Sequence, residues 1–76
     1  MRIISEINLR DFEAWSGGET TLRNLTEREA VELEKIIEEY YEDGLTETQL
    51  NDILWFEDDW ICDMLGIDEE DWEGRF

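Results

Sequence analysis

The sequence predicts an all-α fold, a compact bundle of four or five short helices, and leaves room for one short N-terminal strand. Apolar residues recur at three- and four-residue steps, which is the spacing of one helix face. Two copies of the capping-box signature mark helix starts. Although the net charge is -17, 41% of the residues are hydrophobic, more than a disordered acidic tail carries. Since no Pro-rich or Ser/Gly-rich linker divides the chain, we expect residues 1–76 to form a single acidic helical domain.

The N-terminal segment has two interpretations. Asn8 is a suitable cap for a short helix that the glycines at 17 and 18 would end. The apolar face of this helix would comprise Leu9, Phe12 and Trp15. Alternatively, the β-branched isoleucines at positions 3, 4 and 7 favour a short strand, although no second strand is evident to pair with it.

The clearest element is a helix over residues 27–43. The segment from Thr26 to Glu29 has the form of a capping box, in which the Thr hydroxyl and the Glu carboxylate satisfy two free N–H groups. Gly44 supplies a left-handed stop. The predicted apolar face consists of Ala30, Leu33, Ile36, Ile37, Tyr40 and Tyr41.

Two further helices are expected in the second half. Thr46 to Gln49 repeats the capping signature and opens a helix with Leu50, Ile53 and Leu54 on its buried side. The acids at 57–59 suit the positive N-terminal end of the next helix, which Gly66 would end. Whether the chain bends or continues at Trp55-Phe56 stays open. A last turn is expected over 68–73, around Trp72.

Charge is distributed unevenly along the chain. Residues 1–35 hold 8 acids and 5 bases, whereas residues 36–76 hold 15 acids and Arg75 as their one base. The scattered cations do not favour direct binding of nucleic acid, because phosphate binding needs clustered Lys and Arg. An anionic membrane surface would also repel the chain. We therefore expect neither nucleic acid nor a membrane as a direct partner.

Catalysis, cofactors and a defined metal site are not expected. The chain has no His, so the usual general base is missing, and with 23 acids a pair of carboxylates at any given distance is not informative. A calcium loop with Gly44 at its sixth position would place Leu50 where a bidentate Glu belongs. Cys62 is the single cysteine, and no apolar run is long enough for a signal peptide or a membrane span. These features predict a soluble, cytoplasmic protein.

Two stretches of sequence carry a resemblance. They are Ile7-x-Leu9-x-x-Phe12-x-x-Trp15-Ser16-Gly17 and Leu50-Asn51-Asp52-x-x-Trp55-Phe56-Glu57-x-Asp59-x-Ile61-x-x-x-Leu65-Gly66. Together they resemble small acidic proteins encoded by bacterial phages and mobile elements, over about two thirds of the chain. Where such proteins have Tyr-Pro-Asp-Gly, this chain has Tyr41-Glu42-Asp43-Gly44. The resemblance implies a phage or mobile-element origin, and hence a bacterial host cell, and it carries no information about catalysis.

The acidic surface suggests a function. Glu34, Glu38 and Glu42 are spaced i, i+4, i+8 on the long helix, so their carboxylates lie about 6 Å apart along its axis. Such a row approximates the phosphates of a nucleic-acid strand. The main hypothesis is a non-catalytic inhibitor that occupies a basic, nucleic-acid-binding groove of a host protein, with a CRISPR nuclease or a restriction system as the first example to test. The candidate binding residues are Glu34, Glu38, Glu39, Glu42, Asp43, Trp55, Glu57, Asp58, Asp59, Asp63 and Trp72.

Two alternatives stand beside this hypothesis. The acids could serve only to keep a small protein soluble and monomeric. The chain could also be a structural or regulatory module that binds a partner through an exposed Trp/Phe surface. For that surface Trp55 and Trp72 are the expected exposed anchors, because each has acids close by in sequence. Trp15 and Trp60 are expected to pack in the core, and Cys62 to be a small buried apolar residue.

Overall fold

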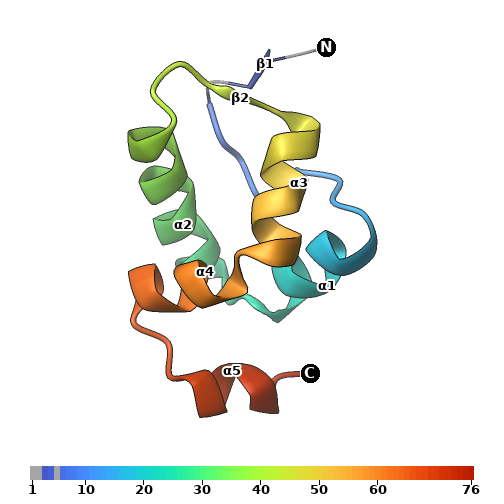
Figure 1. The fold of residues 1–76 in the computed structure, drawn as a ribbon, viewed down its shortest axis with the longest axis vertical. Helices are drawn as coiled ribbons and strands as arrows, with labels where there is room; N and C mark the ends of the chain where they lie inside the picture. The colour runs from blue at the N-terminus through green and yellow to red at the C-terminus, as the bar shows by residue number, and fades with distance from the viewer. Residues whose placement is uncertain (1–2, 5) are drawn as a thin grey trace.

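The computed structural model describes residues 3–4 and 6–76, which form a mostly helical molecule with one short sheet (Figure 1). The predicted fold class is confirmed. The elements, in chain order, are β1 (Ile3–Ile4), α1 (Ser16–Asn24), α2 (Glu27–Tyr40), β2 (Leu45–Thr46), α3 (Glu47–Phe56), α4 (Asp58–Leu65) and α5 (Glu69–Gly74).

Both predicted capping boxes are present and set the starts of α2 and α3. In α2 the Thr26 hydroxyl accepts a hydrogen bond from the Glu29 N–H, and the Glu29 carboxylate accepts one from the Thr26 N–H. Thr46 and Gln49 make the same reciprocal pair at the start of α3. These bonds satisfy N–H groups that have no partner inside the helix.

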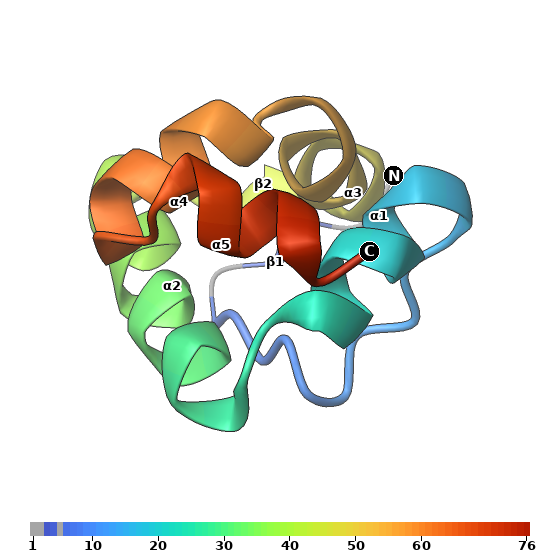
Figure 2. The ribbon, with the colours of Figure 1, turned by 90° about the horizontal axis from the view of Figure 1, so that it is seen from below.

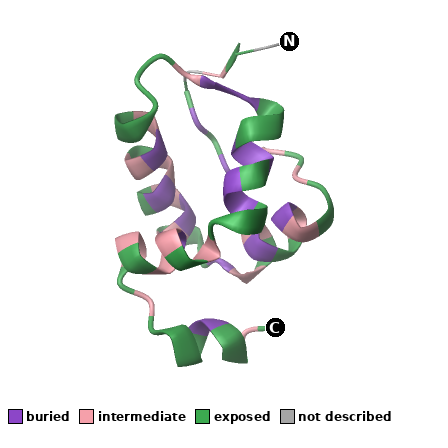
Figure 3. Ribbon diagram, in the orientation of Figure 1, coloured by how far each residue is buried: buried purple, intermediate pink, exposed green. Residues whose placement is uncertain are grey.

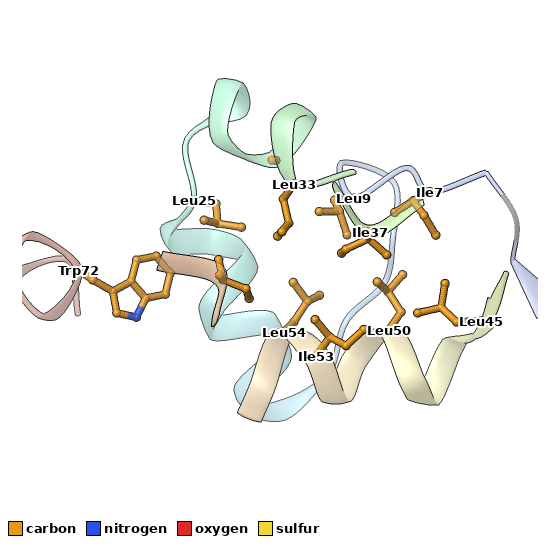
Figure 4. Packing of buried hydrophobic residues seen from close by; sticks show 12 residues of the cluster. Ile7, Leu9, Leu25, Leu33, Ile37, Leu45, Leu50, Ile53, Leu54 and Trp72 are labelled. Carbon is orange, nitrogen blue, oxygen red and sulfur yellow. The ribbon is translucent and has the colours of Figure 1, made fainter. Parts of the chain in front are cut away.

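The core lies between α2 and α3. Leu33 and Ile37 of α2 point toward Leu50 and Leu54 of α3 (Figure 4). Coloured by burial, the two helices turn their buried sides inward and their exposed sides outward (Figure 3). The buried apolar cluster consists of Ile7, Leu9, Leu25, Ala30, Leu33, Ile37, Leu45, Leu50, Ile53, Leu54, Ile61 and Trp72.

The short N-terminal strand, one of the two interpretations of this segment, is present, and its partner lies between α2 and α3. β1 pairs antiparallel with β2, with Ile3 opposite Thr46 and Ile4 opposite Leu45. Gly44 precedes β2 with a φ of 85°, and a Cβ at this position would lie 2.7 Å from the carbonyl oxygen of Ile4. Only glycine fits both that backbone conformation and that approach. The long helix therefore ends at Tyr40, earlier than the predicted residue 43, and Gly44 belongs to the turn into β2.

The predicted short helix over residues 8–15 is wrong. Residues 12–15 are irregular, and the helix of this region is α1, which begins at Ser16 and includes both glycines. A Cβ on Gly17 would overlap the Trp55 indole, and one on Gly18 would overlap the Asn51 side chain. The two glycines thus allow α1 to lie directly against α3 and do not end a helix.

The chain bends after Trp55-Phe56. Helix α3 ends at Phe56, Glu57 has a non-helical φ of -109° and ψ of 34°, and α4 starts at Asp58. Helix α4 packs against α2 and ends at Gly66, whose φ of 69° is left-handed as predicted.

Helix α5 runs across the lower end of the bundle (Figure 2). The expected last turn around Trp72 is therefore present, but Trp72 is only 4% exposed and anchors α5 to the core. Its predicted role as an exposed anchor is wrong. Trp15, predicted to be in the core, is 41% exposed. Trp60 is half-buried against the core, as is Cys62.

An acidic face around an aromatic pocket

One group of predicted binding residues lies at the C-terminal end of α2. Glu39, Glu42 and Asp43 are exposed and line a shallow hollow beside Tyr40. Glu38 is half-buried on the same helix. Because this end carries the partial negative charge of the helix dipole, the backbone adds to the negative field of these carboxylates.

Glu34 differs from the other acids of its row. Its side chain is half-buried, and its carboxylate accepts a hydrogen bond of 2.9 Å from the Leu9 N–H. Glu34 therefore fastens the N-terminal segment to α2, and it is committed to a partner within the molecule.

A second acidic group lies between α4 and α5. Asp58, Asp59 and Asp63 line a hollow of about 460 Å³ together with Asp68, Glu69 and Glu73. Cys62 lies in the same hollow, where burial and the nearby carboxylates Asp58 and Asp59 raise the pKa of its thiol. A raised pKa lowers the thiolate fraction at neutral pH, so this thiol is a poor nucleophile.

Aromatic side chains form a pocket beside these two groups. It has a volume of about 340 Å³ and lies where α2, α3 and α4 meet. The rings of Tyr40 and Trp60 are in edge-to-face contact, with centroids 5.5 Å apart. Phe56 is 63% exposed and Tyr40 is 60% exposed. The lining comprises Tyr40, Tyr41, Asp52, Ile53, Phe56, Glu57 and Trp60.

The pocket brings together residues that were not predicted to be neighbours. Of its lining, Glu57 alone was a candidate binding residue. Tyr40 and Tyr41 fit the apolar spacing of the long helix, so their periodicity favoured burial. The sequence feature that could have indicated their exposure was their position at the helix end, beyond the last residue of α2 that packs in the core.

Trp55 is the predicted anchor that the structure leaves exposed. It is 41% exposed, and its indole stacks on the Phe56 ring with centroids 4.7 Å apart. Phe56 in turn lines the aromatic pocket. The two side chains therefore make a continuous aromatic surface at the end of α3.

The two acidic groups and the pocket are adjacent. Tyr40 lines both the pocket and the hollow at the end of α2, and Glu57 of the pocket directly precedes Asp58 of the α4–α5 group. We call this combined surface the acidic face. It comprises the carboxylates of Glu39, Glu42, Asp43, Asp52, Glu57, Asp58, Asp59 and Asp63, together with Tyr40, Tyr41, Phe56 and Trp60 of the pocket.

The charges of the acidic face are not neutralised within the part of the chain that the structure describes. None of its carboxylates takes part in an ion pair there. The one base of the second half, Arg75, is engaged with Glu29 and Asp71 at 2.6 and 3.0 Å. The carboxylates of the face are thus available to an external cation.

A hollow formed by the first half of the chain has a different character. It has a volume of about 500 Å³ and is lined by apolar residues, including Leu22 and Phe12, and by as many polar or charged ones. Its rim carries the ion pairs Arg10–Glu27 and Arg23–Glu19. Since two bases and two acids of its lining are paired and Glu13 alone is left over, this hollow has a weaker net field than the acidic face.

Within the described ranges 3–4 and 6–76, no group of three or more acidic or cysteine side chains is arranged to hold a metal ion. No helix in those ranges has the length and apolar character needed to cross a bilayer. No protein-family model matches the chain, and the searches of curated proteins and of solved structures find no match to it either.

Proposed function

We propose that this protein is a non-catalytic binding protein whose acidic face occupies a basic, nucleic-acid-binding groove of another protein. The observation that carries this proposal is the set of carboxylates on α2, α3 and α4 that have no ion-pair partner among the described residues. They surround an aromatic pocket. Interfaces commonly have such an aromatic centre and a charged rim.

Electrostatic attraction between the acidic face and a basic partner would drive the proposed binding. Residues 36–76 hold 15 acids against Arg75 alone. A field of this sign steers a basic partner toward the face and raises the association rate. The carboxylates replace the phosphates that the groove of the partner normally neutralises.

The resemblance to small acidic proteins of phages and mobile elements suggests the biological setting. In a bacterial cell, such a protein would inhibit or modulate a nucleic-acid-handling enzyme of the host. A CRISPR nuclease or a restriction enzyme is the first class to test.

Capture and competition test this function. The immobilised protein is incubated with nuclease-treated bacterial lysate, and the retained proteins are eluted with a short DNA duplex. We expect a basic nucleic-acid-binding protein that DNA releases and that dissociates as salt rises, because electrostatic contacts are screened. Retention that neither DNA nor salt reduces would contradict the proposal.

Two matched charge-reversal variants separate the face from net charge. Reversal of Glu39, Glu42 and Asp63 to Lys is expected to abolish capture, since all three are exposed on the acidic face. Reversal of the exposed Glu6, Asp11 and Glu13 changes net charge equally and should leave capture nearly intact. Equal loss from both variants would show that net charge alone binds, and unchanged capture by both would exclude mimicry.

Apolar docking is the second candidate function, and the exposure of Trp55 and Phe56 favours it. In that case the stacked pair would bind a partner helix, and capture would persist at high salt, because burial of apolar surface is not screened. Trp55→Ala would then abolish capture, while the reversals at Glu39, Glu42 and Asp63 would have little effect.

A further inference from the structure

We propose that the aromatic pocket at the junction of α2, α3 and α4 binds an arginine side chain of the partner protein. This inference deepens the proposed function and rests on it for the source of the arginine. It assigns a specific ligand chemistry to the centre of the acidic face.

The walls of the pocket suit a flat cation. Phe56 and Tyr40 are largely exposed, so they offer ring surface to a ligand, and Trp60 is in contact with Tyr40. The face of an aromatic ring is the negative end of its quadrupole and attracts a cation within about 6 Å of the centroid. At about 340 Å³, the pocket is near the lower end of the roughly 300–1,000 Å³ range of ligand sites, which suits a single side chain.

The polar groups of the pocket have one sign. Asp52 and Glu57 contribute carboxylates, and none of the described residues that line the pocket is a base. The carboxylates would repel an anion. An apolar side chain would displace water from the two carboxylates without replacing the hydrogen bonds that the water makes to them. A cation interacts favourably with both the ring faces and the carboxylates.

Arginine fits better than lysine. Its guanidinium group is planar, stacks on aromatic faces and donates paired hydrogen bonds to a carboxylate. The ammonium group of lysine is more strongly hydrated and offers no flat surface to stack. The combination of ring faces with two carboxylates therefore selects the guanidinium.

A second copy of this chain is not the expected occupant. With a net charge of -17, two copies that met through this pocket would bring their acidic faces together. Juxtaposition of like charges at an interface is strongly unfavourable. Arg75, the base nearest to the C-terminus, is held by Glu29 and Asp71 within its own molecule.

Short peptides test the pocket without the unidentified partner. Tetra-arginine, tetra-lysine and tetra-citrulline are titrated into ¹⁵N-labelled full-length protein while the four indole N–H signals are followed by NMR. The Trp60 signal is assigned from its loss in Trp60→Phe. Tetra-arginine should shift it most, tetra-lysine should bind several-fold more weakly, and the neutral tetra-citrulline should leave it unchanged.

Substitutions in the pocket measure how much each side chain contributes to peptide binding. Tyr40→Leu and Phe56→Leu are each expected to weaken tetra-arginine binding by about two- to fivefold, the equivalent of one exposed cation–π contact. Asp52→Asn with Glu57→Gln should weaken it further. Phe76→Leu, which alters an exposed aromatic ring that does not line the pocket, is the matched control and should bind normally. The amide NMR spectrum verifies that every variant is folded.

Two outcomes would overturn the assignment. One is equal perturbation of Trp60 by arginine and citrulline peptides, and the other is normal binding by both Tyr40→Leu and Phe56→Leu. These failures are distinct from failure of the proposed function. If peptides bind in the pocket but DNA releases no captured protein, the groove-binding function is wrong. If capture depends on Glu39, Glu42 and Asp63 while tetra-arginine leaves Trp60 unchanged, the pocket assignment alone is wrong.

Discussion

Arg75 connects the C-terminal segment to the junction of α1 and α2. Its guanidinium donates to both oxygens of the Glu29 carboxylate at 2.6 and 3.0 Å and to the Asn24 carbonyl at 2.9 Å. It also lies 5.6 Å from the centroid of the Trp72 ring. The two side chains of the pair are about one-fifth exposed, at 21% and 19%. A bidentate, partly buried pair of this kind is stronger than an ordinary surface ion pair.

The pair makes stability depend on pH in a defined direction. The hydrogen bonds from Arg75 lower the pKa of Glu29 from 4.5 to about 2. Because the folded pKa is below the unfolded one, the stabilisation is fully present above about pH 4.5 and is lost as pH falls toward 2. Glu29→Gln should therefore cost about 2 to 3 kcal/mol at pH 7, and the difference from the parent should shrink across that window. Urea denaturation at several pH values measures it.

Glu32→Gln provides the control for this experiment. It removes one exposed acid from the same helix without breaking an ion pair between described residues. A pH-independent difference between the parent and Glu29→Gln would show that the pair does not perturb the Glu29 titration.

At the scale of the elements, the packing of α1 on α3 explains the two motifs. The backbone N–H of Trp15 donates a hydrogen bond of 3.0 Å to the side-chain oxygen of the buried Asn51. Gly17 and Gly18 lie against Trp55 and Asn51. The residues of the motif at 15–17 thus contact those of the motif at 50–57, and this contact joins two helices. The motifs have a structural role that holds whatever the function is.

Gly18→Ala tests this helix contact. The added methyl group would overlap the Asn51 side chain, which is fully buried and hydrogen-bonded to Trp15. Overpacking of this kind typically costs about 1–3 kcal/mol, and we expect that loss in the free energy of unfolding by urea denaturation. Gly74→Ala is the matched control, because a Cβ there meets nothing within 4 Å. A Gly18→Ala protein as stable as Gly74→Ala would mean that the two helices separate without cost.

At the scale of the whole molecule, the free energy gained by burying the core must exceed the repulsion among the acidic side chains. The carboxylates of the acidic face have no ion-pair partners among the described residues, so folding holds like charges near one another. The buried cluster between α2 and α3 supplies the compensating free energy. This balance predicts a protein that salt stabilises.

Raising sodium chloride from about 10 to 150 mM shortens the Debye length from roughly 30 to 8 Å. We expect the melting temperature to rise, by about 4 to 8 °C for each 1 kcal/mol of repulsion that is screened. Circular dichroism at increasing salt measures this shift, and the Glu39, Glu42 and Asp63 reversal variant should show a smaller one. A flat or falling melting temperature would show that the acidic residues are paired or do not lie on a folded surface.

The helical class and the starts of α2 and α3 follow from the amino-acid sequence alone. Capping boxes and apolar spacing are local features, since they depend on residues within one or two turns. The left-handed stop at Gly66 was equally local, because glycine adopts positive φ without a steric penalty. The acidity of the second half was also evident from composition alone.

The packing role of the glycines, the burial of the tryptophans and the aromatic pocket depend on how the helices pack together. Glycine ends a helix in one context and allows two helices to pack closely in another. The local sequence therefore predicts wrongly that the glycines of α1 end a helix, because their role depends on the position of α3. Trp72 is buried and Trp15 is exposed because burial depends on which helix lies opposite, and neighbouring acids in sequence carry no such information. The pocket of Tyr40, Phe56 and Trp60 exists because the bend at Glu57 brings α4 against the end of α2. Such contacts join residues far apart in sequence, and local spacing does not specify them.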